Sequence, residues 1–303
     1  MKLLNWILNQ KWAVKPTELR MAAAIVKAWT EGREDQLDPA AALRLRELRA
    51  GGRYGGGYGG GGRYVMEDDR GRDYREPFTM HGRVAVVPVC GLIARHAGMV
   101  NGLSQPEGIA VEDLVRNLQS AARRSQRLLL DVDSPGGTLA GMSELAACID
   151  GLRAGGVRVV ALARDQMCSG AYWMSCRCDD IFAVGTAEVG SIGVYQCVTD
   201  FSRQLDEAGI TVHLLASGVH KGAGAEGTEL NEVQRDGLLE CVMDAAALFT
   251  RTVAQGRGLD QEEAATVSTG MAWMAEQALA LKLIDGIVSG RDELIEQMNG
   301  MED

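Results

Sequence analysis

The sequence predicts an α/β protein with a parallel-stranded core, preceded by a helical N-terminal extension. From residue 82 onward, short apolar runs typical of buried strands alternate with longer stretches of helical periodicity. Residues 51–62 contain nine glycines, a composition that does not form a packed core. We therefore expect a helical extension over residues 1–50, a Gly-rich flexible linker over 51–78, the main domain over 79–290 and a C-terminal tail over 291–303.

The extension is expected to contain two helices, over residues 15–32 and 38–51. Pro16 and Thr17 suit the start of the first helix, and Gly32 suits its end. Asp38 is the expected N-cap of the second helix, with Pro39 in its first turn.

The main domain is expected to alternate strands and helices along the chain. Buried strands are predicted over residues 83–89, 127–133, 157–163, 180–184 and 211–216. Helices are predicted over residues 109–123 and 139–156, and a short one begins after residue 168. A long amphipathic helix is predicted over residues 231–256, with one apolar face formed by Leu238, Val242, Ala245, Phe249 and Val253.

Charge and composition exclude several classes of function. The net charge of −10 and the pI of about 5.0 argue against a nucleic-acid partner, which requires clustered Lys and Arg. No apolar run approaches the roughly 18 residues that a membrane span needs, and the N-terminus is too interrupted for a signal peptide. The seven cysteines are scattered without a Cys-x-x-Cys motif, which favours free thiols in a reducing cytosol over a metal site. We expect no cofactor.

Four short segments follow predicted strands and carry the candidate chemistry. "DSPGGT" (133–138) has a glycine pair that lets the backbone approach a ligand. "CSGA" (168–171) places Ser169 at a helix start, where free N–H groups favour negative charge. "GSIGV" (190–194) holds Ser191 between two glycines, and "ASGVHKGAGAEG" (216–227) holds Lys221. Each segment alone is a weak signal.

Together and in this order, the four segments resemble the signal-peptide-peptidase and phage protein C family of serine–lysine peptidases, also called the protease IV family. Ser191 follows Ser169 by 22 positions (191 − 169) and Lys221 follows it by 52 (221 − 169), spacings similar to those of bacterial single-domain members. The resemblance covers about residues 82–290, including the segment 269–287. It implies the ClpP/crotonase fold, built from stacked ββα units.

The resemblance also implies a role for each candidate residue. Ser169 would be the nucleophile, Lys221 the general base, and Ser191 the residue that orients the lysine amine. The oxyanion donors would be the backbone N–H groups of Gly136, Gly137 and Gly170. A lysine amine has a pKa of about 10.4 in water, and burial lowers that value. A desolvated lysine can therefore serve as a base without a His/Asp pair.

The sequence departs from the family pattern at three places. Asp133 stands where family members carry Asn, and a carboxylate near an oxyanion site would be unfavourable unless it points away. Cys168 precedes the serine and is a rival nucleophile. The loop around Lys221 differs from the family's Lys-Tyr-Lys-Asp pattern, and the neighbouring His220 is expected to be structural or solvated.

The N-terminal helices and linker, in place of a membrane anchor, resemble phage and prophage head-maturation proteases. This branch implies a scaffold or capsid polypeptide as substrate, a location in the host cytoplasm or procapsid, and a homo-oligomeric ring or dome. The apolar segment 269–288 also favours a subunit interface. Three alternatives stay open: a cytoplasmic signal-peptide-peptidase-like protease, a crotonase-type acyl-CoA enzyme, and an inactive structural capsid component.

Overall fold

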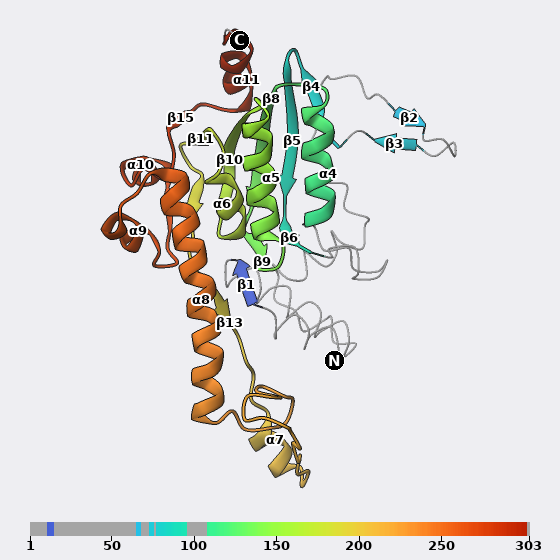
Figure 1. Ribbon diagram of the computed structural model, residues 1–303, viewed down its shortest axis with the longest axis vertical. Helices are drawn as coiled ribbons and strands as arrows, with labels where there is room; N and C mark the ends of the chain where they lie inside the picture. Colours follow the sequence, from blue (N-terminus) through green and yellow to red (C-terminus); the bar gives the residue numbers. More distant parts are fainter. Residues whose placement is uncertain (1–10, 15–64, 68–72, 76, 96–107, 302–303) are drawn as a thin grey trace.

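A computed structural model describes residues 11–14, 65–67, 73–75, 77–95 and 108–301, which form a mixed α/β fold (Figure 1). The predicted fold class is confirmed. The two helices predicted before residue 52 and the glycine-rich run 51–62 lie outside the described residues, so they remain predictions.

The larger sheet supplies the framework of the molecule. Its strand order is β14 (Ala272–Met274), β12 (Glu188–Gly190), β10 (Arg158–Cys168), β8 (Arg127–Ser134), β5 (Val84–Cys90) and β4 (Thr79–His81). β11 (Asp180–Val184) pairs with the first half of β10, and β15 (Gly286–Val288) pairs with β11. The edge strands β4 and β14 are antiparallel to their neighbours, whereas the inner strands run parallel.

Both faces of this sheet are buried, which explains why its strands read as continuous apolar runs. Alternate residues of β5, β8 and β10 enter two different clusters, as Val87 and Leu130 do on one face and Val86 and Leu129 on the other. Helices α4 (Val111–Ala122), α5 (Met142–Ala154) and α6 (Gly170–Ser175) pack on the first face. α11 (Arg291–Gly300) covers the second face through Leu294, Ile295 and Met298.

A smaller sheet adjoins the C-terminal ends of these strands. Its order is β13 (Tyr195–Gln196), β1 (Lys11–Val14), β9 (Gly136–Thr138), β6 (Leu92–Ala94) and β7 (Gly108–Ala110). The prediction did not anticipate β1, which lies within the extension that we expected to be helical. The region expected as linker also contains structure: β2 (Val65–Glu67) pairs with β3 (Asp73–Arg75), and Phe78 is buried in the main core.

The predicted long helix is confirmed as α8 (Glu232–Arg257), which begins at a capping box formed by Asn231 and Gln234. Phe249 and Val253 bury its C-terminal half against the core. Its N-terminal half projects away from the sheet together with α7 (Ser202–Glu207) (Figure 1). We call residues 197–230, which include α7, the arm.

One predicted strand is wrong. Residues 211–216 form no strand; they lie exposed in the arm, and no sheet edge of the described structure pairs with them. Leu215 is 95% exposed, so the apolar character of this run does not reflect a buried core strand. After α8, the chain adds α9 (Gln261–Val267) and α10 (Ala275–Ala280). Among the described residues, no helix is both long enough and apolar enough to cross a membrane.

Candidate active site

Ser169 lies at the turn between β10 and α6 and has an unusual backbone. It is the N-cap of α6 with φ 53° and ψ −118°, and only 1% of its surface is exposed. Its backbone N–H donates to the Gly190 carbonyl oxygen at 2.7 Å, and its own carbonyl oxygen accepts from the Trp173 N–H at 2.9 Å. A buried non-glycine residue at positive φ carries strain that neighbouring structure must maintain, and such residues cluster at functional sites.

Ser191 lies beside Ser169 because their strands are paired in register. Cys168 of β10 pairs with Gly190 of β12, so the next residue of each strand emerges at the same edge of the sheet. Ser191 also has a positive φ, 52°, and donates its N–H to the Met271 carbonyl oxygen at 2.6 Å. Three non-glycine residues of the described structure have positive φ, and the two predicted site serines are two of them.

Two of the three predicted oxyanion glycines, Gly136 and Gly137, lie on β9 next to the same edge, and the third, Gly170, is the first residue of α6. Ser134 pairs with Met167 at the end of β8, the chain enters β9 two residues later, and α6 packs against β9. Gly137 approaches the neighbouring strand so closely that a Cβ atom would lie 1.6 Å from the Ile93 carbonyl oxygen. The structure therefore brings Gly136, Gly137 and Gly170 to the region of Ser169.

Ser134 organises the entry to β9, a role that the sequence analysis did not assign. Its hydroxyl donates to the Gly91 carbonyl oxygen at 2.6 Å and accepts from the Gly136 N–H at 3.2 Å. The Gly136 N–H thus already has a partner within the protein. The only sequence signal for this contact was its place before Pro-Gly-Gly.

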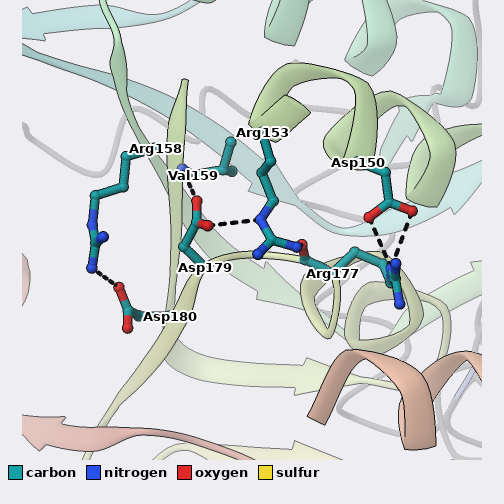
Figure 2. A network of polar contacts seen from close by, with 7 residues as sticks. All are labelled: Asp150, Arg153, Arg158, Val159, Arg177, Asp179 and Asp180. Carbon is teal, nitrogen blue, oxygen red and sulfur yellow. Dashed lines mark hydrogen bonds and ion pairs between the residues drawn. The ribbon is translucent and has the colours of Figure 1, made fainter. Parts of the chain in front are cut away.

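The far end of α6 is anchored to its surroundings by charged side chains, as Figure 2 shows. Asp179 accepts from Arg153 Nε at 2.7 Å and from the Val159 N–H at 2.8 Å. Arg177, just after α6, donates from Nε to the Asp150 carboxylate at 2.9 Å. Each partly exposed pair contributes on the order of 1 kcal/mol or less, but together they join the end of α6 to α5 and β10.

Aromatic side chains hold the middle of α6. Trp173 stacks on Phe249 of α8 with ring centroids 4.4 Å apart. The Tyr172 hydroxyl donates to the Leu283 carbonyl oxygen at 2.8 Å, and burial raises the pKa of this phenol well above its ordinary value. The helix that begins at Ser169 is therefore fixed along its whole length.

Cys168 and Asp133, two of the departures from the family pattern, have side chains directed away from this site. Cys168 is fully buried, and its sulfur contacts the Glu188 carbonyl oxygen at 3.6 Å. Asp133 lies next to Ser134 on β8, so their side chains point to opposite faces of the sheet. Burial and repulsion from Asp165 raise the pKa of the Asp133 carboxyl.

The structure does not bring Lys221 to Ser169 within one chain. Lys221 is exposed on the arm. The residue before it, His220, packs against Gly237 near the start of α8. Trp173 contacts the same helix at Phe249, 12 residues later (249 − 237). At 1.5 Å per residue, the two contacts are about 18 Å apart along the helix axis. Figure 1 shows α7 beyond the N-terminal end of α8, on the far side from α6.

The described residues contain no group of three or more His, Cys, Asp or Glu side chains placed to hold a metal ion. None of the seven cysteines forms a disulfide bond, and Cys176 and Cys178 are buried. Burial raises the pKa of the Cys176 thiol to about 12. Apart from Cys168, which is adjacent in sequence, the thiols are not among the residues gathered around Ser169.

The fold and site together define an α/β protein with a strained serine at a strand-to-helix turn, flanked by a second serine and a glycine strand. Comparison with known proteins identifies the family. Residues 152–302 match the model of peptidase family S49. The chain therefore contains a domain of peptidase family S49, which confirms the resemblance seen in the sequence.

Individual relatives belong to phages and to bacteria. The chain is 30% identical to the head-tail preconnector protein GP5 of Enterobacteria phage P21 over 213 residues, 70% of this chain and 42% of the relative. It is 28% identical to the capsid assembly protease C of Escherichia phage lambda over 232 residues (75% and 51%). It is 27% identical to the probable protease SohB of Haemophilus influenzae over 197 residues (65% and 55%). The chain thus spans about half the length of these relatives.

Proposed function

We propose that the protein is a serine endopeptidase in which Ser169 is the nucleophile and Lys221 of a second subunit is the general base. The observation that carries the proposal is the meeting of Ser169, Ser191 and the β9 glycines at one edge of the sheet, within a family S49 domain. A serine hydroxyl requires a base and oxyanion donors, and this edge supplies candidates for the donors.

In the proposed reaction, the neutral lysine amine takes the Ser169 hydroxyl proton as Oγ attacks the peptide carbonyl carbon. Among the three glycines, Gly170 at the start of α6 is the best candidate to stabilise the oxyanion, because the Gly136 N–H already donates to Ser134 and Gly137 pairs with strands on both edges of β9. The lysine then protonates the leaving amine, and water hydrolyses the acyl-enzyme. Ser191 would orient the lysine amine.

The exposed position of Lys221 motivates the second subunit. A solvated lysine amine is a poor base at neutral pH, and within one chain Lys221 lies far from Ser169. The same part of the molecule exposes apolar side chains: Ile210, Val212, Leu214, Leu215 and Val219 on the arm, and Val233, Leu239 and Met243 on α8. A second copy packed over the arm would bury these residues, desolvate Lys221 and complete the site.

The predicted C-terminal interface fits this arrangement in part. Met271, Met274 and Leu279 are exposed and available to a partner. Leu283 is fully buried, and Trp273 and Leu281 pack against the core of their own chain. The segment 269–288 therefore both closes the monomer and leaves apolar surface outside.

For the biological role, we propose head maturation of a phage or prophage, with scaffold or capsid polypeptides as substrates. The similarity to the capsid assembly protease C of phage lambda and to the head-tail preconnector protein of phage P21 supports this assignment. The host cytoplasm or the procapsid would be the place of action. The similarity to the probable protease SohB keeps a cytoplasmic signal-peptide-peptidase-like protease as the second candidate.

Mixing two inactive variants tests the shared site. Ser169→Ala subunits retain the lysine, and Lys221→Met subunits retain the serine, so neither homo-oligomer should cleave a denatured protein. After co-refolding, about a quarter of the sites in a ring should pair an intact serine with an intact lysine. Activity in the mixture, and in neither parent, supports the proposal. An inactive mixture that native mass spectrometry shows to contain mixed oligomers contradicts it.

A further inference from the structure

Strand β1 occupies a position between two segments of the candidate site. Trp12, Ala13 and Val14 pair antiparallel with Thr138, Gly137 and Gly136 of β9. On its other edge, β1 pairs antiparallel with β13 through Lys11 and Trp12. Figure 1 shows β1 between β9 and β13, although it comes from the other end of the chain.

Both neighbours of β1 belong to the site. β9 carries the candidate oxyanion glycines, and β13 starts at Tyr195, four residues after Ser191. Adjacent strands lie about 4.8 Å apart, so β9 and β13 are separated by about 10 Å, the width of one extended chain. Without β1, two sheet edges would face each other across a slot that accepts one strand through its backbone groups.

The direction of β1 matches that of a bound substrate. Val14 lies opposite Gly136, and this end of β9 follows directly from Ser134 and Pro135. Ser134 pairs with Met167, two residues before Ser169. The N-to-C direction of β1 therefore leads toward the nucleophile. A peptidase requires this direction for the part of its substrate that precedes the cleaved bond, because that part supplies the attacked carbonyl.

We propose that β9 and β13 form the binding groove for the substrate segment preceding the cleaved bond, and that β1 is a built-in competitor for this groove. This inference rests on the proposed peptidase function. The groove takes an extended polypeptide, which is held by main-chain hydrogen bonds and therefore tolerates many side chains. The N-terminal segment must leave before a substrate can bind.

The decisive experiment measures occupancy without catalysis. It uses the full chain with Ser169→Ala and a fluorescent peptide that copies residues 8–18. The test variant adds Trp12→Pro and Ala13→Pro, which removes two backbone donors from β1. The matched control adds Trp12→Thr and Ala13→Thr, which keeps both N–H groups in residues that favour strands.

A tethered competitor weakens the apparent affinity of the groove for an added peptide. The added peptide binds only the fraction of molecules whose groove is empty. The peptide should therefore bind the proline variant at least about tenfold more tightly than it binds the control or the unmodified N-terminus. Equal affinity for all three proteins, or no binding to a proline variant whose circular dichroism matches the control, overturns the inference.

A cross-link provides a second measurement that needs no proline. Trp12 and Thr138 are directly opposite in antiparallel register, a placement that suits a disulfide between Trp12→Cys and Thr138→Cys. The oxidised double variant should lose peptide binding and regain it with reductant, whereas Trp12→Cys alone should not respond. Peptide binding that survives a verified cross-link contradicts the proposal.

Kinetics separate this inference from the proposed function. With Ser169 intact, the proline variant should show a KM about tenfold below that of the control at an unchanged kcat. If hydrolysis depends on Ser169 but the proline variant and its control have identical KM values, the peptidase function is supported and the competitor role of β1 is rejected. The expected peptide binding without any Ser169-dependent hydrolysis would support the groove and reject the peptidase.

Discussion

Ser169 donates its backbone N–H to the Gly190 carbonyl oxygen at 2.7 Å, and this bond joins the two serine-bearing segments of the site. Gly190 has φ 115°, and a Cβ atom there would lie 2.7 Å from the Trp273 ring. The position of Ser169 thus depends on a glycine that no other residue replaces without strain.

Gly190→Ala should therefore lower both stability and activity. We expect a loss of about 1–3 kcal/mol in the free energy of unfolding from backbone strain alone, measured by urea denaturation. Gly193→Ala is the matched control, because the nearest atom to its Cβ would be at 3.5 Å and its φ is not positive. Equal effects of the two substitutions would show that Gly190 has no special role in placing Ser169.

Lys221→Arg should be nearly as damaging to peptide hydrolysis as Lys221→Met. Arginine keeps the positive charge but does not give up its proton in a protein, so it cannot act as a base. The measurement is kcat/KM for an unfolded protein substrate, with the oligomer's mass checked for each variant. An arginine variant with wild-type activity would exclude the lysine as general base.

Asp133→Asn should make the protein more stable at neutral pH. Burial, followed by repulsion from Asp165, raises the pKa of this carboxyl, so the folded state holds the proton more tightly than the unfolded chain. Stability is therefore lost as the pH rises from the ordinary aspartate range through the raised pKa.

The gain from Asp133→Asn should be modest, about 1 kcal/mol or less, because the group is partly solvated. It should shrink to nothing well below the ordinary aspartate pKa of about 3.9, where the carboxyl is protonated in both states. Thermal unfolding of both proteins across this pH range measures the difference. A wild type that is the more stable protein at pH 7 would contradict the inferred direction.

Thiol labelling should report the proposed assembly. Cys197 on the arm and Cys241 on α8 are exposed in a single chain, whereas Cys176 is buried with a thiol pKa of about 12. Iodoacetamide at pH 8 should modify Cys197 and Cys241 only after dilution dissociates the oligomer, and Cys176 only after unfolding. Light scattering provides the mass: a species of 32.5 kDa with full activity would show that the monomer is the working unit.

The strands of the main sheet could be predicted from the sequence because both of their faces are buried. Alternate residues of β8 and β10 lie in two different core clusters, so each strand is a continuous apolar run in the sequence. The segment 211–216 has a similar composition, but it lies exposed on the arm. Composition alone does not distinguish a buried core strand from an exposed apolar segment.

The site could be predicted only in part. Its serines and glycines were found from the order and spacing of short motifs, but their positive φ values were not, because serine has no preference that reveals them. β1 could not be predicted either. Three of its four residues pair with β9, which begins 122 positions later (136 − 14), and such long-range pairing leaves no local pattern. The distance between Lys221 and Ser169 likewise follows from the path of α8.

The rate at which the protein cleaves a denatured polypeptide tests the central claim most directly. Ser169→Ala removes the proposed nucleophile, and Cys168→Ala is the matched control at the adjacent position. We predict that Ser169→Ala lowers the rate by at least about a thousandfold while its circular dichroism is unchanged, and that Cys168→Ala stays active. Full activity in the Ser169→Ala protein, with loss of activity in Cys168→Ala, would contradict the assignment of the nucleophile.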